Sequence, residues 1–255
     1  MASAQDISPP LTLEELVTVF RQEVDDLPGD TVTDVNWKND DNGLLWKNQE
    51  AVRYANRAID EYCFRNPILD QDTESAITQI AVVASTNQYS YSQKILSIRR
   101  MKFVETTTGD EFIVRKRTVG WMDQYVPKWE LETPSEGVVE FYIEDADHRV
   151  ITLYRAPEVA GTLHMVVDRL PIKYLSWSRR HLDTPEIDQF HHYDLVDHMV
   201  YQAYQKRDAE TENPELGTAA LDRFTANVGE RPSARLLRVR RNERNYPRRA
   251  RAAYF

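Results

Sequence analysis

The spacing of apolar residues predicts two helices in the first quarter of the chain. Thr12 and Glu15 form a capping-box pattern that starts the first helix. Its apolar stripe is expected at Leu13, Leu16, Val17, Phe20 and Val24. A second helix is expected from about Asn48 to Arg65, because the next residue, Asn66, precedes a proline and so avoids helical backbone. The buried positions expected of this second helix are Val52, Ala55, Ile59 and Cys63.

Two more helices are expected after about residue 180. Thr184-Pro185-Glu186 combines an N-cap residue, a proline suited to the first helical position and an acid near the positive end of the helix dipole. We expect this helix to reach about Arg207 with a buried stripe of Phe190, Tyr193, Val196, Val200, Ala203 and Tyr204. Asn213-Pro214-Glu215 repeats the same chemistry, and Gly229 is a suitable end. The inward positions expected of this last helix are Leu216, Ala220, Phe224 and Val228.

Between about residues 75 and 170 the apolar period changes to two, which is typical of strands. Val139, Phe141 and Ile143 alternate with the outward positions expected at 140, 142 and 144, and the same alternation recurs at 151–153 and 163–167. Further strands are expected at 77–83, 95–104 and 112–117, the middle one bulged because its apolar face switches after Ile98. The aromatic-rich segment 118–129 is expected to be a short helix or an ordered loop. The pattern predicts an antiparallel β region with one buried face.

Strands grouped between helices favour an α+β fold over a doubly wound sheet. We expect a helical bundle built from both chain ends, with an inserted antiparallel β subdomain and an extended C-terminal arm. The expected segments are N-terminal bundle helices at 1–70, the β subdomain at 71–175, C-terminal bundle helices at 176–230 and the arm at 231–255.

The net charge of −9 over 255 residues conceals two oppositely charged parts. Residues 231–255 contain nine arginines, no lysine and one acid, whereas residues 1–230 contain 23 basic and 40 acidic side chains. This asymmetry indicates an interaction arm, and arginine suits bidentate pairing with carboxylate or phosphate. A protein-docking arm is favoured; an inert tail and a nucleic-acid contact are the alternatives, the second opposed by the acidic body. The arm's expected contact residues are Arg235, Arg238, Arg240, Arg241, Arg244, Tyr246, Arg248, Arg249, Arg251, Tyr254 and Phe255.

Three aromatic residues between the predicted strands admit two interpretations. Trp121, Tyr125 and Trp129, together with Tyr89 and Tyr91, could pack in the core or lie in a subunit or partner interface, where Trp and Tyr are enriched. Core packing is the simpler interpretation, and the first three residues are the candidates for an interface.

Motifs for catalysis are weak. The chain has no glycine-rich phosphate loop and no nucleophile elbow, and its one cysteine, Cys63, is expected to be a small core residue. His191, Asp194 and His198 fall on one face of a predicted helix and could converge on a metal, although surface or interface histidines are the favoured interpretation. We therefore expect no catalytic residues, no metal and no cofactor; a metal-dependent hydrolase is the remaining enzymatic alternative.

Several segments resemble the head–tail adaptor proteins of tailed bacteriophages. They are the opening Leu11–Leu16, the helix Trp46–Tyr62 with its Tyr54-Ala55-Asn56-Arg57-Ala58 motif, the start of the β insertion at Ile95–Met101, and the late helix with Tyr193 and Ala203-Tyr204. The resemblance covers residues 11–230 in element order; the arginine arm and the acidic loop at 30–43 have no residue-by-residue counterpart.

The resemblance implies a structural protein of the virion, without catalytic activity. Such adaptors form a ring, typically of twelve subunits, that binds the portal protein and offers a docking surface to a tail or nozzle protein in the neck between head and tail. Double-stranded DNA passes through the ring without specific binding, for which an acidic channel wall is suited. The start of the chain has no signal-peptide pattern and no apolar run approaches a membrane span, so we expect assembly in the host cytoplasm and no membrane contact. The alternative is a nucleic-acid-binding or packaging accessory protein that uses the arginine arm.

Overall fold

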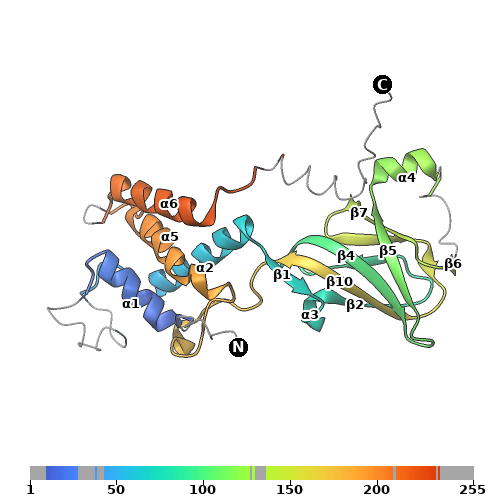
Figure 1. Ribbon diagram of the computed structural model, residues 1–255, viewed down its shortest axis with the longest axis horizontal. Coiled ribbons are helices and arrows are strands. Elements are labelled where there is room, and N and C mark those ends of the chain that lie inside the picture. Colours follow the sequence, from blue (N-terminus) through green and yellow to red (C-terminus); the bar gives the residue numbers. More distant parts are fainter. Residues whose placement is uncertain are drawn as a thin grey trace, which may run out of the picture. The chain divides into compact units, whose positions relative to one another are not determined.

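The computed structural model describes residues 10–27, 38, 43–126, 128–129, 136–208, 211–233 and 235. The chain divides into two compact units. The helical unit comprises the chain up to Ile68 and Leu170–Arg231, and the β unit comprises Leu69–Arg169 with the chain from Pro232 onward. Six α-helices and a mixed sheet lie within the described residues, so the fold class is α+β (Figure 1).

Four helices form the helical unit: α1 (Leu13–Glu23), α2 (Asn48–Arg65), α5 (His192–Tyr204) and α6 (Pro214–Val228). The predicted capping box is present at α1, where Thr12 and Glu15 bond reciprocally. The stripes predicted for α1 and α2 are buried in one hydrophobic core to which α5 and α6 also contribute. Most helix–helix contacts within the unit involve α5, which contacts α1, α2 and α6.

The prediction for the third helix is wrong in its start and in part of its face. Residues 184–188 do not form a helix; a 3-10 turn at Gln189–His191 leads into α5 at His192. Phe190 and Tyr193, predicted to be buried, are 68% and 58% exposed. The preceding segment instead bonds to the start of α1, since Leu13 and Glu14 donate backbone hydrogen bonds to carbonyls at 183 and 180. These tertiary bonds outweigh the local helix-start signal. In α6 the predicted Leu216 is likewise half exposed, whereas Ala220, Phe224 and Val228 are buried.

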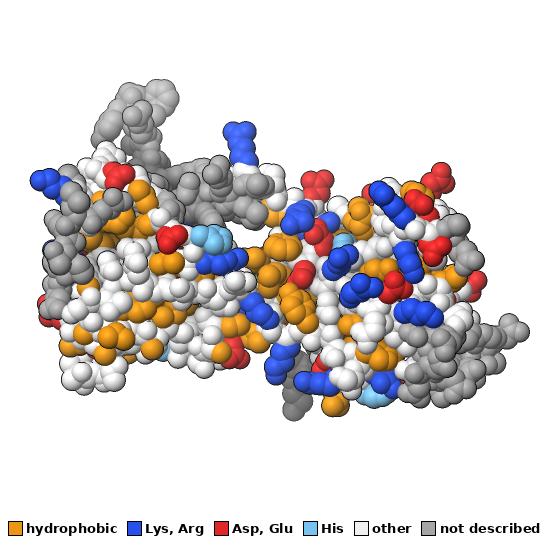
Figure 2. Space-filling view, turned by 180° about the vertical axis from the view of Figure 1, so that it is seen from behind, with side chains coloured by type: hydrophobic (Ala, Val, Ile, Leu, Met, Phe, Trp, Pro, Cys, Tyr) orange, Lys and Arg blue, Asp and Glu red, His pale blue; other side chains and the backbone are white. Residues whose placement is uncertain are grey.

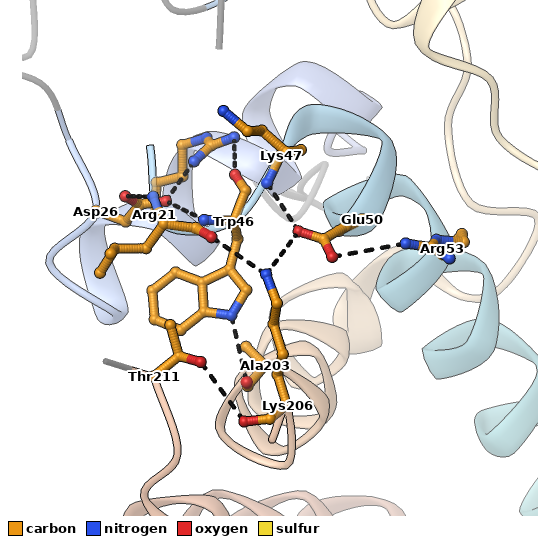
Figure 3. A network of polar contacts seen from close by, with 10 residues as sticks. Arg21, Asp26, Trp46, Lys47, Glu50, Arg53, Ala203, Lys206 and Thr211 are labelled. Carbon is orange, nitrogen blue, oxygen red and sulfur yellow. Dashed lines mark hydrogen bonds and ion pairs between the residues drawn. The ribbon is translucent and has the colours of Figure 1, made fainter. Parts of the chain in front are cut away.

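A buried polar network joins the end of α1 to the start of α2 (Figure 3). The guanidinium of Arg21 pairs with Asp26 at 2.6 Å and donates to the Trp46 carbonyl at 2.9 Å and to Asn48 Oδ1 at 2.8 Å. The indole of Trp46 donates to the Ala203 carbonyl on α5 at 3.2 Å. Burial raises the pKa of Asp26, against which its backbone hydrogen bonds and the Arg21 charge act. The network ties both ends of the acidic segment 28–42 to the core; Asp40 and Asp41 themselves lie outside the described residues.

The β unit contains an eight-stranded sheet in its described part, with the path β1-β10-β4-β5-β7-β8-β3 and β2 paired to β10. The strands are β1 (Ile68–Gln71), β2 (Gln79–Val82), β3 (Gln88–Ser90), β4 (Ile95–Glu105), β5 (Glu111–Arg117), β7 (Phe141–Asp147), β8 (Val150–Tyr154) and β10 (Gly161–Arg169). A two-stranded ladder pairs β6 (Glu136–Gly137) with β9 (Ala156–Pro157), and the short helix α3 spans Ser75–Thr78. The predicted bulge in β4 is confirmed, because its register against β10 shifts between Ile98 and Arg100.

The expectation of a purely antiparallel β region is wrong. Strands β5 and β7 pair in parallel, with Arg115 opposite Phe141 and Arg117 opposite Ile143. The connection between them includes α4 (Val119–Tyr125), and a crossover of this length allows parallel pairing, which a tight hairpin does not. The segment 118–129 thus contains the helix predicted as one of its two options.

Strand β7 is also buried differently from the predicted alternation. Ile143 is buried as expected, but Tyr142 and Glu144, expected to face outward, are buried as well. Glu144 forms an ion pair with Lys116 on the parallel neighbour β5 and accepts a hydrogen bond from Tyr91. A strand covered on both faces does not alternate in polarity. The apolar residues predicted to be buried in β8 and β10, at 151, 153, 163, 165 and 167, are buried. The alternation is confirmed for β10 from 161 to 167, but it is wrong for β8, where Thr152 is buried as well.

Candidate functional site

The root of the arginine arm is held on α2. The guanidinium of Arg231 lies 3.1 Å from Glu61 Oε2 and stacks over the ring of Phe64 at 4.7 Å. A carboxylate on one side and an aromatic face on the other are the two contacts that a planar guanidinium favours. The first arginine of the arm is therefore already engaged within the helical unit.

The residues just before Arg231 are fixed by two side chains at the end of α2. Arg65 Nη1 donates to the Gly229 carbonyl at 2.6 Å, and Asn66 Nδ2 donates to the Val228 carbonyl at 2.9 Å. These carbonyls end α6, where the helix dipole favours a cation. Arg65 also bonds Glu61 at 3.1 Å, so Glu61 accepts from both arginines. The exit of the arm from the helical unit is consequently a defined point.

Of the predicted arm contacts, the structure describes only Arg235, which is exposed. The others, at 238, 240, 241, 244, 246, 248, 249, 251, 254 and 255, lie outside the described residues. Their role stays a prediction. The root contacts at Glu61, Phe64 and Arg65 were not predicted from the sequence. The only signal for them is an acid and an aromatic residue on α2, and these lie 160 or more positions before the arm in the sequence.

The structure brings two of the three candidate interface aromatics together in the β unit. Trp121 and Tyr125 on α4 have ring centroids 4.9 Å apart, and the ring centroids of Trp121 and Phe141 on β7 are 5.4 Å apart, so the three rings form a row. Trp129 lies outside this row and donates its indole N–H to Asp123 at 2.9 Å. Tyr125 is exposed, and Trp121 and Phe141 are partly buried.

Arg117 lies between strand and helix in this aromatic row. Its guanidinium is 4.6 Å from the Trp121 ring and 4.9 Å from the Phe141 ring. Cation–π contact with two rings holds α4 on β5 and β7. Tyr89, one of the other aromatics, is a buried residue whose hydroxyl bonds the backbone at 83 and 86, so the core interpretation is correct for it.

The histidines on α5 do not gather around a metal site. No group of three or more potential metal ligands occurs among the described residues. His191 pairs with Asp194 at 2.8 Å, whereas His198 bonds Gln202 and contacts the Phe224 ring. His198 is only 8% exposed, so interpreting it as a surface histidine is wrong, and its neighbour His192 on α5 is buried as well. Burial lowers the pKa of His198 to about 4, and the nearby charge of Arg65 acts in the same direction.

The Asn56 side chain in the Tyr54–Ala58 motif makes a reciprocal pair of hydrogen bonds. Its Nδ2 donates to the Leu175 carbonyl at 3.0 Å, and its Oδ1 accepts from the Leu175 amide at 2.9 Å. An amide that pairs with backbone in both directions aligns the segment after the β unit along α2. The motif therefore has a definite structural role in this chain.

Comparison with known families decides the assignment. A family model described as SU10 adaptor protein matches residues 11–252. The chain belongs to the SU10 adaptor protein family. The match spans both units and extends into the arginine arm, as well as covering the segments that resemble phage head–tail adaptors. A search of curated proteins gives no match. No helix in the described part of the chain is long and apolar enough to cross a membrane.

Proposed function

We propose that this protein is the head-to-tail adaptor of a tailed bacteriophage, forming a ring that binds the portal protein and joins it to a tail or nozzle protein in the neck of the virion. The observation that carries the proposal is the family match over residues 11–252. Twelve subunits surround the channel through which double-stranded DNA passes without specific binding. The protein acts as a structural component assembled in the host cytoplasm, without a catalytic step.

The arm is the portal-binding element in this proposal. Arg231 fixes its root, and residues 235–255 supply eight further arginines and three aromatics for docking. Arginine, tyrosine and phenylalanine combine charge with rigid apolar area, a composition suited to a protein interface. The helical unit forms the bundle that positions the arm, and the row of Trp121 and Tyr125 in the β unit is a candidate contact for the tail side.

The test is a mass measurement of the protein alone and after mixing with the portal protein of the same phage. We expect the full-length protein to form a ring on the portal and the variant that lacks residues 234–255 to form none. The deletion leaves the Arg231–Glu61 ion pair and the described core intact, so the loss would come from the arm and not from unfolding. A matched control deletes the same segment and fuses a neutral linker of equal length. A protein that never associates with portal, full length or not, contradicts the proposal.

A nucleic-acid role for the arm is the second candidate, favoured only by its arginine content. Neutralising several phosphates makes binding steeply salt-dependent. Salt-dependent binding to double-stranded DNA that disappears with residues 234–255, while portal association is unchanged, would favour the second candidate over the first.

A further inference from the structure

The helical unit is acidic in sum but carries a basic face. Its sequence contains 24 acidic and 13 basic side chains, yet the exposed side of α2 presents Arg53 and Arg57 one turn apart. Lys173 and Arg179, both exposed, lie on the segment that the Asn56–Leu175 hydrogen bonds hold along α2. Figure 2 shows Lys and Arg side chains interspersed with Asp and Glu over one face of this unit, at the right of the view. We call Arg53, Arg57, Lys173 and Arg179 the basic face.

The acids around the basic face are largely engaged in bonds within the unit. Glu50 accepts from Lys206 at 3.2 Å and from the Lys47 amide at 3.0 Å. Asp60 accepts from the Tyr174 hydroxyl at 3.0 Å. Arg53 reaches Glu50 only at 3.7 Å, and Arg179 pairs with Asp183 at 3.0 Å. Neither Arg57 nor Lys173 has an ion pair within the described part of the chain. The positive charge of Arg57 and Lys173 is therefore open to a partner.

An acidic and aromatic surface occupies another side of the same unit. Phe190, just before α5, and Tyr193 on α5 have exposed rings, and the half-buried Asp194 and Asp197 follow within two turns. Asp194 bonds His191 and Asn227, and Asp197 pairs with Arg223 at 2.8 Å, so a partner would share these carboxylates with contacts inside the unit. Glu23 at the end of α1 is close enough to affect Asp197, whose pKa is raised first by burial and further by the charges of Asp194 and Glu23, against its bond to Arg223. We call Glu23, Phe190, Tyr193, Asp194 and Asp197 the acidic face.

Asp197 of the acidic face points away from α2, which carries Arg53 and Arg57 of the basic face. Gln202, on the inner side of α5, donates to the Tyr54 carbonyl of α2 at 3.1 Å. Asp197 precedes it by five residues, which places it about 140° around the helix, on the side remote from α2. A single copy can therefore use both faces at once.

We propose that the basic face of one copy docks against the acidic face of a second copy, head to tail. Opposite charge supplies orientation, and the exposed rings of Phe190 and Tyr193 supply apolar area and faces on which guanidinium groups stack. The chain already uses this mode internally, where Arg231 lies on Glu61 and Phe64. Contacts between two different faces are heterologous, and they generate a ring when the rotation closes. Closure into a ring rests on the proposed function; the pairing of the two faces does not.

Site-directed cross-linking tests the pairing directly. Cys63 is buried and is the only cysteine, so Cys63→Ala provides a thiol-free background. In it, Arg57→Cys with Tyr193→Cys should give a ladder of oligomers with a flexible bis-maleimide, in the free protein or after mixing with portal. Either substitution alone should give no ladder. The matched control pairs Tyr193→Cys with Arg115→Cys, an exposed position on β5 outside the basic face, and should also give none.

Charge reversal provides a second readout. Arg53→Glu with Arg57→Glu should weaken self-association at least tenfold, whereas Arg100→Glu with Arg115→Glu, an equal charge change in the β unit, should not. Partial recovery is expected when the α2 variant is mixed with a Glu23→Arg, Asp197→Arg variant. Circular dichroism of each variant before mixing confirms that it is folded.

Three outcomes overturn the pairing. Oligomers that form without a specific cross-link ladder refute it and leave the ring proposal standing, whereas the absence of any oligomer, with or without portal, refutes both. Binding of random-sequence double-stranded DNA that only the α2 charge reversal abolishes would assign the basic face to nucleic acid instead.

Discussion

Arg65 at the end of α2 donates a 2.6 Å hydrogen bond to the carbonyl of Gly229, 164 positions later in the chain. The same side chain bonds Glu61 and Thr225 and stacks on the Phe224 ring at 4.7 Å. Arg65 thus joins α2, whose outer side we assign to self-association, to α6, from which the arm leaves.

Replacing Arg65 by methionine should destabilise the helical unit by about 2 kcal/mol, because three acceptors, at Glu61, Thr225 and Gly229, lose one charged donor while most of the packing volume is kept. Urea denaturation measures the change. Arg57→Met is the matched control on the exposed side of α2 and should stay within about 0.5 kcal/mol of the wild type. Equal effects of the two substitutions would contradict the role assigned to Arg65.

The stability of the helical unit should fall in mild acid because of His198. Its pKa is about 4 in the folded protein, whereas an exposed histidine titrates near 6.5, so the unfolded chain binds more protons between these values. The stabilisation is complete above pH 6.5 and is lost as the pH falls to about 4, amounting to about 3 kcal/mol. Burial lowers the pKa of His192 as well and adds to the slope.

Thermal denaturation from pH 4 to 7 measures this dependence. His198→Gln should show a shallower slope, since glutamine keeps a polar side chain but binds no proton. Arg57→Met, an exposed substitution on α2 that removes no group titrating between pH 4 and 7, is the control and should leave the slope unchanged. A His198→Gln slope equal to that of the wild type would refute the assignment.

Two glycines should respond to alanine in opposite directions. A Cβ at Gly161 would lie 2.4 Å from the Val104 carbonyl and 2.4 Å from the Phe103 ring, so Gly161→Ala should cost about 1–3 kcal/mol through overpacking between β10 and β4. At Gly217 in α6 the nearest atom, Tyr204 Cβ, is at 3.4 Å, and alanine should stabilise by about 0.5–1 kcal/mol through helix propensity. Melting temperatures of the two variants check both signs.

Breaking the buried pair of Arg21 and Asp26 should be among the most damaging single changes. Arg21 is fully buried, and Arg21→Met leaves the Asp26 carboxylate without its cation, at a cost of about 3–5 kcal/mol. The double variant Arg21→Met, Asp26→Asn should lose less free energy of unfolding than the two single variants lose in sum. In the double variant no buried charge is left without a partner, because asparagine is neutral. Additive free energies of unfolding would mean that the two residues are not coupled.

Local signals predicted the elements whose caps and buried faces lie within one segment. Helix α1 begins as expected because Thr12 caps it, and helix α2 begins and ends as expected because Asn66-Pro67 closes it. The bulge near Ile98 was predictable for the same reason, because a switch of apolar face is visible within one strand.

Features that depend on partners far away in the chain were not predictable in this way. The segment before α5 uses its carbonyls to bond the start of α1, and Glu144 is buried because Lys116 lies on a parallel neighbour. The arm itself stood out by its charge, but Glu61 and Phe64, which hold its root, lie on α2.

The way the arm is rooted also determines how a pulling force enters the protein. Tension on the chain beyond Arg231 meets that residue's ion pair to Glu61 first, then the bonds from Arg65 and Asn66 to the carbonyls at 229 and 228. These three contacts transmit the force to α2 as well as to α6, so the last turn of α6 does not bear it alone. A load on the arm is in this way spread over two helices and their shared core.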